Sequence, residues 1–424
     1  MEMSRKTFLS LGSGAVLAAG LMTRGRVWGA NDRLRLACVG VRGRGWAHAR
    51  AAGARDDVEI AALCDVDAEV LENRAAEAKQ ALGATPKTYR DIRDLFADDS
   101  IDAVTVATPN HWHVLCGVWA MQAGKDVYLE KPISHTIWEG RQLVAAAKQY
   151  GRVLQHGAQR RSDPLWQRAV ERLRTGIIGE IYWAKCVIHG VREPFWFPQE
   201  ETPPPSLDWA LWQGPAPERP FSRNYVHYNW HWFWPYGNGE IGNNGPHWAD
   251  LVNWMIDKGL PIETHSTGGI FGYDRDARET PNTQLVNHRF ADGTLMQFEV
   301  VNRFCPSSPA VILYGTAGYM EDNRFYDKDR KEIPDDSEPG NVDTTRAHMD
   351  NFIEAVKAGN PGAANATAEQ GHIAAGLCHL GNIAYRLNRS VHFDPKRETF
   401  PGDDEANALL TREYRPGFEV PKLA

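Results

Sequence analysis

The sequence predicts an α/β protein that begins with a parallel, doubly wound sheet. Between residues 34 and 156, short apolar runs alternate with amphipathic stretches that are long enough to form helices. Such alternation is typical of parallel strands joined by crossover helices. A glycine-rich turn joins the first apolar run to the first helix, which is the usual start of such a sheet. After residue 157 the alternation stops, and a different second region is expected.

Five strands are expected in the first region, at residues 34–39, 58–63, 103–107, 127–129 and 153–155. The stretches between them include 68–82, 111–122 and 137–150, which have helical length and spacing. The carboxyl ends of parallel strands meet at one edge of the sheet, and ligands bind there. Polar residues that directly follow these strands are therefore candidate functional residues.

The second region mixes helices, antiparallel strands and an irregular section. A helix is expected at 164–175 and a long strand at 179–189, followed by a Pro- and Trp-rich section at 191–245. Strands are expected at 284–290, 294–301 and 311–314, because Asp292-Gly293 between the first two is a hairpin signal. Helices at 348–358 and 369–387 close the region, and the charged stretch 324–342 is expected to be an exposed loop.

Composition excludes several classes of protein. A net charge of −7 argues against a surface for nucleic acid or an anionic membrane. Eight of the fifteen tryptophans lie between positions 196 and 254, so they are concentrated in the irregular section. The six cysteines are scattered and include no CxxC pair, which argues against disulfides and a cysteine zinc site.

The N-terminus has the pattern of an export signal. Arg5 and Lys6 precede an apolar, glycine-rich stretch, 8–22, that is short for a membrane span. Residues 4–9 resemble a twin-arginine signal with lysine in the second basic position. We therefore expect residues 1–30 to be a signal peptide and the protein to be periplasmic or otherwise exported. An uncleaved membrane anchor is the alternative.

The turn after the first strand has the residues expected for binding a dinucleotide phosphate. Glycines let the backbone approach a pyrophosphate, which sits at the N-terminus of the following helix. The second glycine comes one residue later than in the G-x-G-x-x-G pattern, and an ordinary tight turn is the alternative. The candidate residues are Gly40, Arg42, Gly43, Arg44 and Gly45.

Asp65 follows the second strand, twenty residues after Gly45. A carboxylate at this point binds the adenosine ribose and disfavours a 2′-phosphate, which favours NAD over NADP. A helix N-cap is the other interpretation of Asp65, but Asp67 is better placed to cap the helix that begins at Ala68.

Two further strand ends lie at the same edge. Glu130-Lys131-Pro132 closes the strand at 127–129, and a lysine there can transfer protons once burial lowers its pKa. A surface lysine in a turn is the alternative. Thr108-Pro109-Asn110 follows the strand at 103–107, near the expected position of a nicotinamide. Asn110 also fits a helix N-cap, and His113, inside the helix, also fits a structural role.

The most informative loop of the second region is 236–247, which is rich in glycine and asparagine. Pro246 suits the first turn of a helix, and the residues after it supply that helix with an apolar face. His247 at this helix entrance could exchange a proton with a substrate hydroxyl, or it could be a capping or core histidine. No metal site is predicted, because His227 and His231 lack a third ligand at a suitable spacing.

These features together resemble the Gfo/Idh/MocA family of sugar oxidoreductases. The resemblance covers nearly the whole mature chain and rests on the glycine turn, Asp65, Thr108-Pro109-Asn110, Glu130-Lys131-Pro132 and the segment 242–250. It implies an N-terminal Rossmann domain at 31–156, a substrate and oligomerisation domain with a large, mostly antiparallel sheet at 157–390, and a C-terminal tail at 391–424. It also implies a homo-oligomer, either a dimer or a tetramer.

The resemblance also implies roles for individual residues. Lys131 would lie beside the nicotinamide and contact the reacting hydroxyl, and His247 would match the histidine of the family's D-x-x-x-H pair. The aspartate of that pair falls on Asn243, which cannot act as a base. Cofactor contacts are expected from the glycine turn and from Asp65, Thr108, Pro109, Asn110, His113, Glu130 and Lys131. Substrate contacts are expected from Arg160, Arg223, Tyr228, Trp230, Trp232 and His247.

The expected activity is oxidation of a sugar hydroxyl by hydride transfer to a tightly bound NAD, with NADP as the less favoured cofactor. An NAD-dependent glycosidase that oxidises and re-reduces its substrate is the first alternative. Because such a cycle leaves NAD unchanged, it suits an exported protein without access to free dinucleotide. The second alternative is a sugar- or dinucleotide-binding protein without catalysis, which Asn243 favours and which the presence of both Lys131 and His247 opposes.

Overall fold

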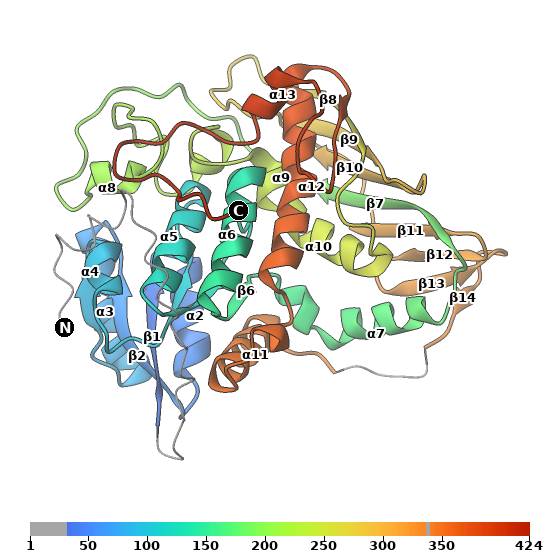
Figure 1. The fold of residues 1–424 in the computed structure, drawn as a ribbon. Helices are drawn as coiled ribbons and strands as arrows, with labels where there is room; N and C mark the ends of the chain where they lie inside the picture. The colour runs from blue at the N-terminus through green and yellow to red at the C-terminus, as the bar shows by residue number, and fades with distance from the viewer. Residues whose placement is uncertain (1–31, 336–339) are drawn as a thin grey trace.

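The computed structural model describes residues 32–335 and 340–424, which form two sheets with helices between and around them (Figure 1). The predicted signal peptide, 1–30, lies outside the described residues. No helix in the described part is long and apolar enough to cross a membrane. The cysteines are free, as expected from their spacing.

The N-terminal sheet has six parallel strands in the order β3-β2-β1-β4-β5-β6, which confirms the predicted doubly wound class. The order reverses between β1 and β4, so the carboxyl ends of these two strands open onto a crevice. The strands are β1 (Leu34–Val39), β2 (Val58–Cys64), β3 (Lys87–Tyr89), β4 (Ala103–Val106), β5 (Asp126–Leu129) and β6 (Leu154–His156).

Helices connect these strands and cover both faces of the sheet. They are α2 (Arg44–Gly53), α3 (Ala68–Leu82), α4 (Ile92–Phe96), α5 (Asn110–Gln122) and α6 (Ile137–Tyr150). Asp67 caps α3 by accepting a hydrogen bond from the Glu69 amide at 3.1 Å, as expected from its position. Asn110 is the first residue of α5 and does not cap it, because Pro109 occupies the N-cap position.

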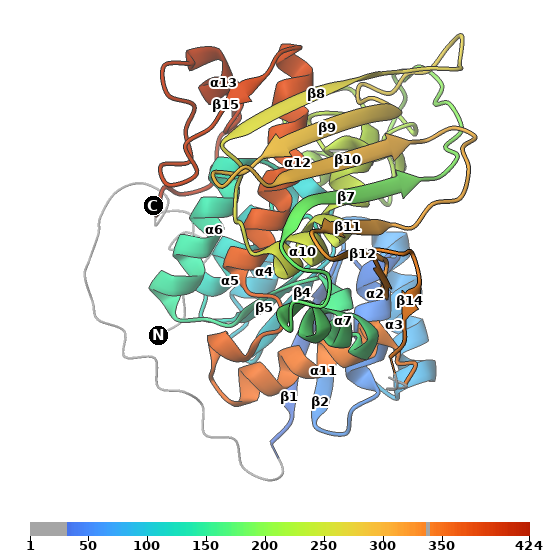
Figure 2. The same cartoon turned by 90° about the vertical axis from the view of Figure 1, so that its right-hand side faces the viewer.

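The second sheet has nine strands in the order β14-β13-β12-β11-β7-β10-β9-β8-β15 and is mostly antiparallel. Figure 2 shows this sheet facing the viewer, with α10 and α12 behind it. The strands are β7 (Ile181–His189), β8 (Glu263–Gly269), β9 (Thr283–Arg289), β10 (Leu295–Val301), β11 (Val311–Gly315), β12 (Gly318–Glu321), β13 (Arg324–Asp327), β14 (Glu332–Ile333) and β15 (Val391–His392).

The hairpin at Asp292-Gly293 is confirmed, since β9 and β10 pair antiparallel and Gly293 has a φ of +92°. One expectation was wrong. The stretch 324–342 is not simply a loop, because β13 and β14 extend the sheet at its edge. The strand β10 also pairs with β7 in parallel. The unpredicted β8 buries polar residues, and its Thr264 hydroxyl lies 2.8 Å from Nδ1 of His288.

Helices and loops of the second half complete the layers. The α-helices are α7 (Pro164–Arg174), α8 (Trp209–Gln213), α9 (Gly239–Asn243), α10 (Gly245–Ile256), α11 (Thr344–Lys357), α12 (Ala368–Leu387) and α13 (Asp404–Ala408). Short 3₁₀ helices are η1 (Gln159–Ser162), η2 (Asn229–Trp232) and η3 (Pro361–Ala363).

The two halves of the chain share their cores. Helix α12 packs on both α6 and β8, so it lies between the two sheets (Figure 1). Met349 and Phe352 of α11 join the apolar core that contains Leu34 and Leu36 of β1. Near the C-terminus, Phe418 packs against the ring of Trp112 in α5. The second half of the chain therefore helps to build the core of the first sheet.

A buried ion pair fixes α10 against η1. Nε of Arg161 donates to Oδ2 of Asp250 at 2.7 Å, and the two side chains are 3% and 1% exposed. The guanidinium also lies over the ring of Trp254, 4.9 Å from its centroid. Because a buried charge without its partner is costly, this pair constrains where the first turn of α10 lies.

We expect Arg161→Met to lower the free energy of unfolding by about 3–5 kcal/mol, because it leaves the Asp250 carboxylate buried without its partner. Arg174→Met, at the exposed end of α7, is the matched control and should change this free energy by less than about 0.5 kcal/mol. Urea denaturation followed by circular dichroism measures both. Equal effects of the two substitutions would contradict the importance of the buried pair.

Candidate functional site

The glycine turn brings the N-terminus of α2 to the carboxyl edge of the parallel sheet. Gly40 has a φ of +75°, and a Cβ there would lie 2.6 Å from the carbonyl oxygen of Ala107 on β4's connection. A Cβ on Gly45 would collide with the Gly40 carbonyl oxygen. By contrast, no atom lies within 4 Å of the Cβ position of Gly43. The turn is thus closed at Gly40 and Gly45, with free space at Gly43 for a phosphate group.

The Asp65 carboxylate holds this turn in place through hydrogen bonds with backbone amides. Its Oδ2 accepts a hydrogen bond from the Val41 amide at 2.9 Å, and its Oδ1 accepts one from the Asp67 amide at 3.1 Å. Burial raises the pKa of the Asp65 carboxyl to about 6, against the opposing effect of these two amides. The carboxylate therefore lies at the end of β2, beside the turn, as expected for a group that binds a ribose.

A cavity of about 650 Å³ extends from the glycine turn to the entrance of α10. Every predicted cofactor residue except Gly45 lines it, and Gly45 packs beneath the turn. The lining set is Gly40, Arg42, Gly43, Arg44, Asp65, Thr108, Pro109, Asn110, His113, Glu130 and Lys131. The cavity also reaches Asn243 and His247, so the two halves of the chain meet around one space.

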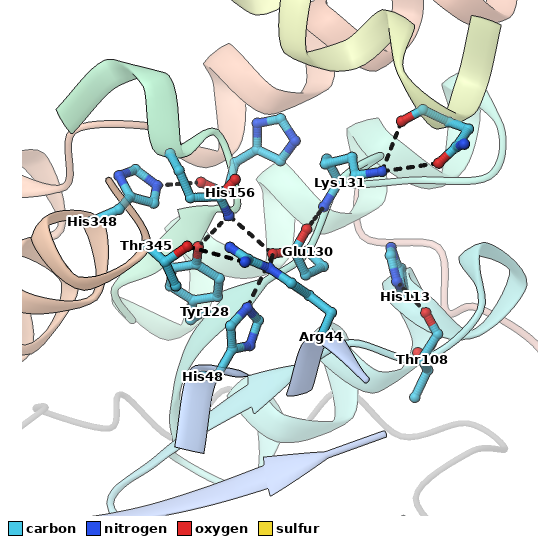
Figure 3. A network of polar contacts seen from close by, with 12 residues as sticks. Arg44, His48, Thr108, His113, Tyr128, Glu130, Lys131, His156, Thr345 and His348 are labelled. Atoms are coloured by element: carbon cyan, nitrogen blue, oxygen red, sulfur yellow. Dashed lines mark hydrogen bonds and ion pairs between the residues drawn. The ribbon is translucent and has the colours of Figure 1, made fainter. Parts of the chain in front are cut away.

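Lys131 is held by the second half of the chain. Its Nζ donates to the carbonyl oxygen of Asn243 at 2.7 Å and to Oδ1 of the same residue at 3.2 Å (Figure 3). Burial lowers the pKa of the Lys131 ammonium below its usual value, and the Glu130 carboxylate opposes this shift. Two oxygen acceptors favour the protonated amine. Asn243 therefore orients Lys131 as a hydrogen-bond donor.

Glu130 is a buried anion behind Lys131 (Figure 3). Its Oε1 accepts from Nε of Arg44 at 2.7 Å, from Nε2 of His48 at 3.0 Å and from Nε2 of Gln159 at 3.0 Å. Burial alone would raise the pKa of Glu130, but the charge of Arg44 and the hydrogen bond from His48 hold it well below its usual range. The side chain of Arg44 is thus turned toward Glu130.

His247 lies at the first turn of α10. Its Nδ1 is buried and has no hydrogen-bond partner among the described residues. Burial lowers the pKa of the imidazole well below its usual value, and the positive charge of Lys131 lowers it further. His247 is therefore neutral at pH 7 and is able to accept a proton.

Two side chains that were predicted to contact the cofactor near its nicotinamide make hydrogen bonds to other groups of the protein. His113 has Nδ1 at 2.6 Å from the Pro132 carbonyl and Nε2 at 2.8 Å from the Thr108 carbonyl. Nδ2 of Asn110 donates to Oδ1 of Asn238 at 3.2 Å. Both side chains thus fasten α5 to the loops around the cavity while lining its wall.

The predicted substrate residues separate into two groups. Tyr228 and Trp230 line the cavity, and the Tyr228 side chain is 52% exposed. Three others do not line it. Trp232 is only 1% exposed, Arg160 lies 4.0 Å over the ring of Trp248, and Arg223 is an exposed side chain 3.3 Å from Glu201.

Three of the six tryptophans of the irregular section, Trp209, Trp212 and Trp230, take part in a separate apolar core. We call residues 204–236 the aromatic cap, because their side chains pack together. The segment lies over the end of the parallel sheet near α5 (Figure 1). Its apolar core contains Leu207, Trp212, Ala216, Phe221, Tyr225, Trp230, Phe233 and Tyr236. The tryptophan content thus reflects a packed cap more than a surface for stacking sugars.

The cap is tied to the sheet beside Asp65. The Ala68 amide donates to the Ser206 carbonyl at 2.9 Å, and the Asp208 amide donates to the Val66 carbonyl at 3.1 Å. Nε2 of His227 lies 3.3 Å from Oδ2 of Asp67. The cap is therefore fastened to the segment beside Asp65, at the end of the cavity where an adenosine would lie.

The cap also supplies His231 to the cavity wall, a residue that the sequence suggested only as half of an incomplete metal pair. Its position depends on η2 and on the packing of the cap, for which no local sequence signal exists. Within residues 32–335 and 340–424, no cluster of His, Cys, Asp and Glu could hold a metal ion.

Comparisons with known proteins agree with this geometry. A family model described as the NAD-binding Rossmann fold of the oxidoreductase family matches residues 34–158. The model for the C-terminal alpha/beta domain of the same family matches residues 195–420. Both models carry the Gfo/Idh/MocA family name.

Curated relatives match over different lengths. The rhizopine catabolism protein MocA of Rhizobium meliloti is 27% identical over 342 residues, which are 79% of this chain and 90% of the relative. A glycosyl hydrolase family 109 protein of Stenotrophomonas maltophilia is 30% identical over 188 residues, which are only 42% of this chain and 40% of the relative.

Solved structures share the fold at low identity. The WlbA dehydrogenase of Bordetella pertussis, in complex with NADH and UDP-GlcNAcA, matches with a TM-score of 0.65 at 20% identity, over 85% of this chain and 99% of that one. The aldose-aldose oxidoreductase of Caulobacter crescentus, complexed with glycerol, matches with a TM-score of 0.65 at 17% identity, over 85% of this chain and 100% of that one. The chain belongs to the Gfo/Idh/MocA oxidoreductase family and carries its NAD-binding Rossmann domain.

Proposed function

We propose that the protein oxidises a ring hydroxyl of a sugar or sugar derivative with an NAD molecule that remains bound between turnovers. The observation that carries this proposal is that Lys131 and His247, from the two halves of the chain, line the same cavity as the glycine turn. The cavity thus has room for a dinucleotide, and its wall presents a cationic side chain, Lys131, and a neutral base, His247.

The residues present fit a dinucleotide. The pyrophosphate would lie at Gly43 and the N-terminus of α2, where there is free space, and the ribose would lie at Asp65. The carboxylate of Asp65 disfavours a 2′-phosphate, which supports NAD over NADP. When bound, the nicotinamide supplies the acceptor for a hydride from the substrate carbon.

The protein side chains accept the hydroxyl proton and stabilise the negative charge on the substrate oxygen. Neutral His247 takes the proton of the substrate hydroxyl. The Lys131 ammonium donates a hydrogen bond to the same oxygen and stabilises the negative charge that develops on it. The family pattern places an aspartate at position 243, but Asn243 contributes by holding Lys131 through two oxygens.

The aromatic cap supports a retained cofactor. It is bonded to the segment 66–68 next to Asp65, so an adenosine bound there would be covered by the second half of the chain. Retention suits the proposed export of the protein, which rests on residues 1–30, because an exported enzyme has no free dinucleotide pool.

A sugar substrate is supported by the relatives, since solved neighbours include an aldose-aldose oxidoreductase and a dehydrogenase in complex with UDP-GlcNAcA. We also propose a homo-oligomer, either a dimer or a tetramer. Its support is the face of the nine-stranded sheet opposite α10 and α12, where Trp183 stacks on Tyr314 at 4.5 Å and Tyr319 on Tyr326 at 4.8 Å.

The second candidate function is an NAD-dependent glycosidase. It is favoured by the relatives named glycosyl hydrolase family 109 and by the covered cofactor end of the cavity. In this cycle a ring hydroxyl is oxidised, the aglycone is eliminated, water is added and the carbonyl is reduced again. No net change in the dinucleotide results, so the cofactor never has to leave.

Lys131→Met should slow reduction of the bound dinucleotide by about 10²–10³-fold, because the developing oxyanion loses its main donor. The dinucleotide content, measured after acid denaturation, should stay at the level of the native protein. Absorbance at 340 nm after mixing with sugar measures the rate. Lys148→Met, on the exposed face of α6, is the control and should not alter it. An unchanged rate in Lys131→Met would refute the proposed mechanism.

A panel of free sugars and p-nitrophenyl glycosides separates the two candidate functions. A dehydrogenase should give a stable 340 nm signal or an oxidised sugar, with no release of nitrophenol. A glycosidase should release nitrophenol while the dinucleotide content and redox state stay constant over many turnovers. If neither signal appears with any of these compounds, a binding protein without catalysis would be the better account.

The pH profile of the reduction rate should be bell-shaped, with both limbs displaced. The pKa of His247 is lowered, so His247 stays neutral as the pH falls below 6.5, and the acid limb should lie below that value. The pKa of Lys131 is also lowered, so its ammonium should be lost below pH 10.5 as the pH rises. Half-maximal activity at about pH 6.5 would contradict the description of His247.

A further inference from the structure

His231 is one of four histidines that line the same cavity, together with His113, His227 and His247. It belongs to η2 within the aromatic cap, whereas His247 belongs to α10, and both line the space that contains the Lys131 side chain. The mechanism proposed above gives His231 no task. Oxidation of one hydroxyl requires a single proton acceptor, and His247 already supplies it.

The orientation of the His231 ring is fixed. Its Nδ1 lies 2.6 Å from the carbonyl oxygen of Tyr228. Since a carbonyl oxygen can only accept, Nδ1 carries the hydrogen and Nε2 keeps its lone pair. The ring of Trp230 stacks on the imidazole with the centroids 3.6 Å apart. The hydrogen bond of the ring among the described residues is made by Nδ1, so the lone pair of Nε2 is available to a ligand in the cavity that His231 lines.

The charges around His231 keep it neutral. Burial lowers the pKa of its imidazole to about 3, and the charge of Lys131 contributes to this shift. His227, four residues earlier, lies 3.3 Å from Asp67 at the other end of the cavity. The Lys131 end of the cavity therefore contains one ammonium and the neutral imidazoles of His231 and His247, while both ring nitrogens of His113 lie against backbone carbonyls.

We propose that His231 removes a proton from the substrate carbon next to the one that is oxidised, an inference that rests on the proposed function. Oxidation turns the hydroxyl-bearing carbon into a carbonyl carbon, which acidifies the neighbouring C–H bond. That bond breaks, its proton goes to Nε2 of His231, and its electron pair forms an enolate. Lys131 donates a hydrogen bond to the enolate oxygen.

The elimination and the addition of water that follow need no reagent other than water. The enolate electron pair forms a carbon–carbon double bond as the bond to the aglycone oxygen breaks, and the leaving oxygen takes a proton from water. The hydroxide of that water then adds to the carbon that lost the aglycone, which regenerates the enolate. The enolate carbon takes a proton from His231 after the proton held there has exchanged with solvent. The low proton affinity of His231 favours this return to the enolate carbon. His231 thus supports the glycosidase candidate specifically.

The test is deuterium exchange in the NAD-loaded protein. The holoenzyme is incubated in D₂O with p-nitrophenyl glycosides of glucose, galactose, mannose and N-acetylglucosamine, and the recovered sugars are analysed by mass spectrometry and proton NMR. The native protein should introduce one deuteron at the carbon next to the oxidised one. His231→Asn should lower this exchange by about 10²-fold while reduction of the bound dinucleotide changes less than about threefold.

Asparagine is chosen because its amide can still donate to the Tyr228 carbonyl, which preserves the local structure without the base. His231→Gln is a second variant, and His392→Asn, an exposed residue of β15, is the control. Dinucleotide reduction without deuterium uptake in the native protein would overturn this role alone. Unchanged exchange in both His231 variants would also overturn it. If the native protein shows no reduction at all, the proposed function falls together with this inference.

Discussion

The buried ammonium of Lys131 is the charge on which the rest of the site depends. It is held in front by two oxygens of Asn243 and supported from behind by the Glu130 carboxylate, itself neutralised by Arg44. A buried cation is costly unless its partners are in place, so this arrangement joins the two halves of the chain at one point. The same charge helps to keep His231 and His247 neutral and thus able to accept protons.

The fold explains why these groups meet. The carboxyl ends of β1, β2, β4 and β5 supply the glycine turn, Asp65, Thr108 and Lys131, because parallel strands all end at one edge. Helices α9 and α10 supply Asn243 and His247 from the second half, and the buried Arg161–Asp250 pair fixes α10. The aromatic cap is bonded to the segment beside Asp65, and this attachment supports the proposed retention of the cofactor.

The sequence was informative wherever function depends on a local position. Five of the six strands of the parallel sheet could be predicted, all except β3, and so could the places of the glycine turn, Asp65 and Lys131, because strand ends and glycines have local signatures. The sequence could not show that Arg160, Arg223 and Trp232 lie outside the cavity, because their positions depend on packing between distant segments. His231 was missed for the same reason. The two outermost strands on one side of the second sheet, β13 and β14, resembled a charged loop, since short strands near a sheet edge need little apolar character.

The most direct test is a crystal structure of the protein with its dinucleotide and a bound sugar that it turns over. The account predicts the nicotinamide beside Lys131, the pyrophosphate at Gly43, and one sugar hydroxyl within about 2.6–3.2 Å of both His247 and the Lys131 ammonium. A sugar bound elsewhere, or a dinucleotide whose nicotinamide lies away from Lys131, would contradict it.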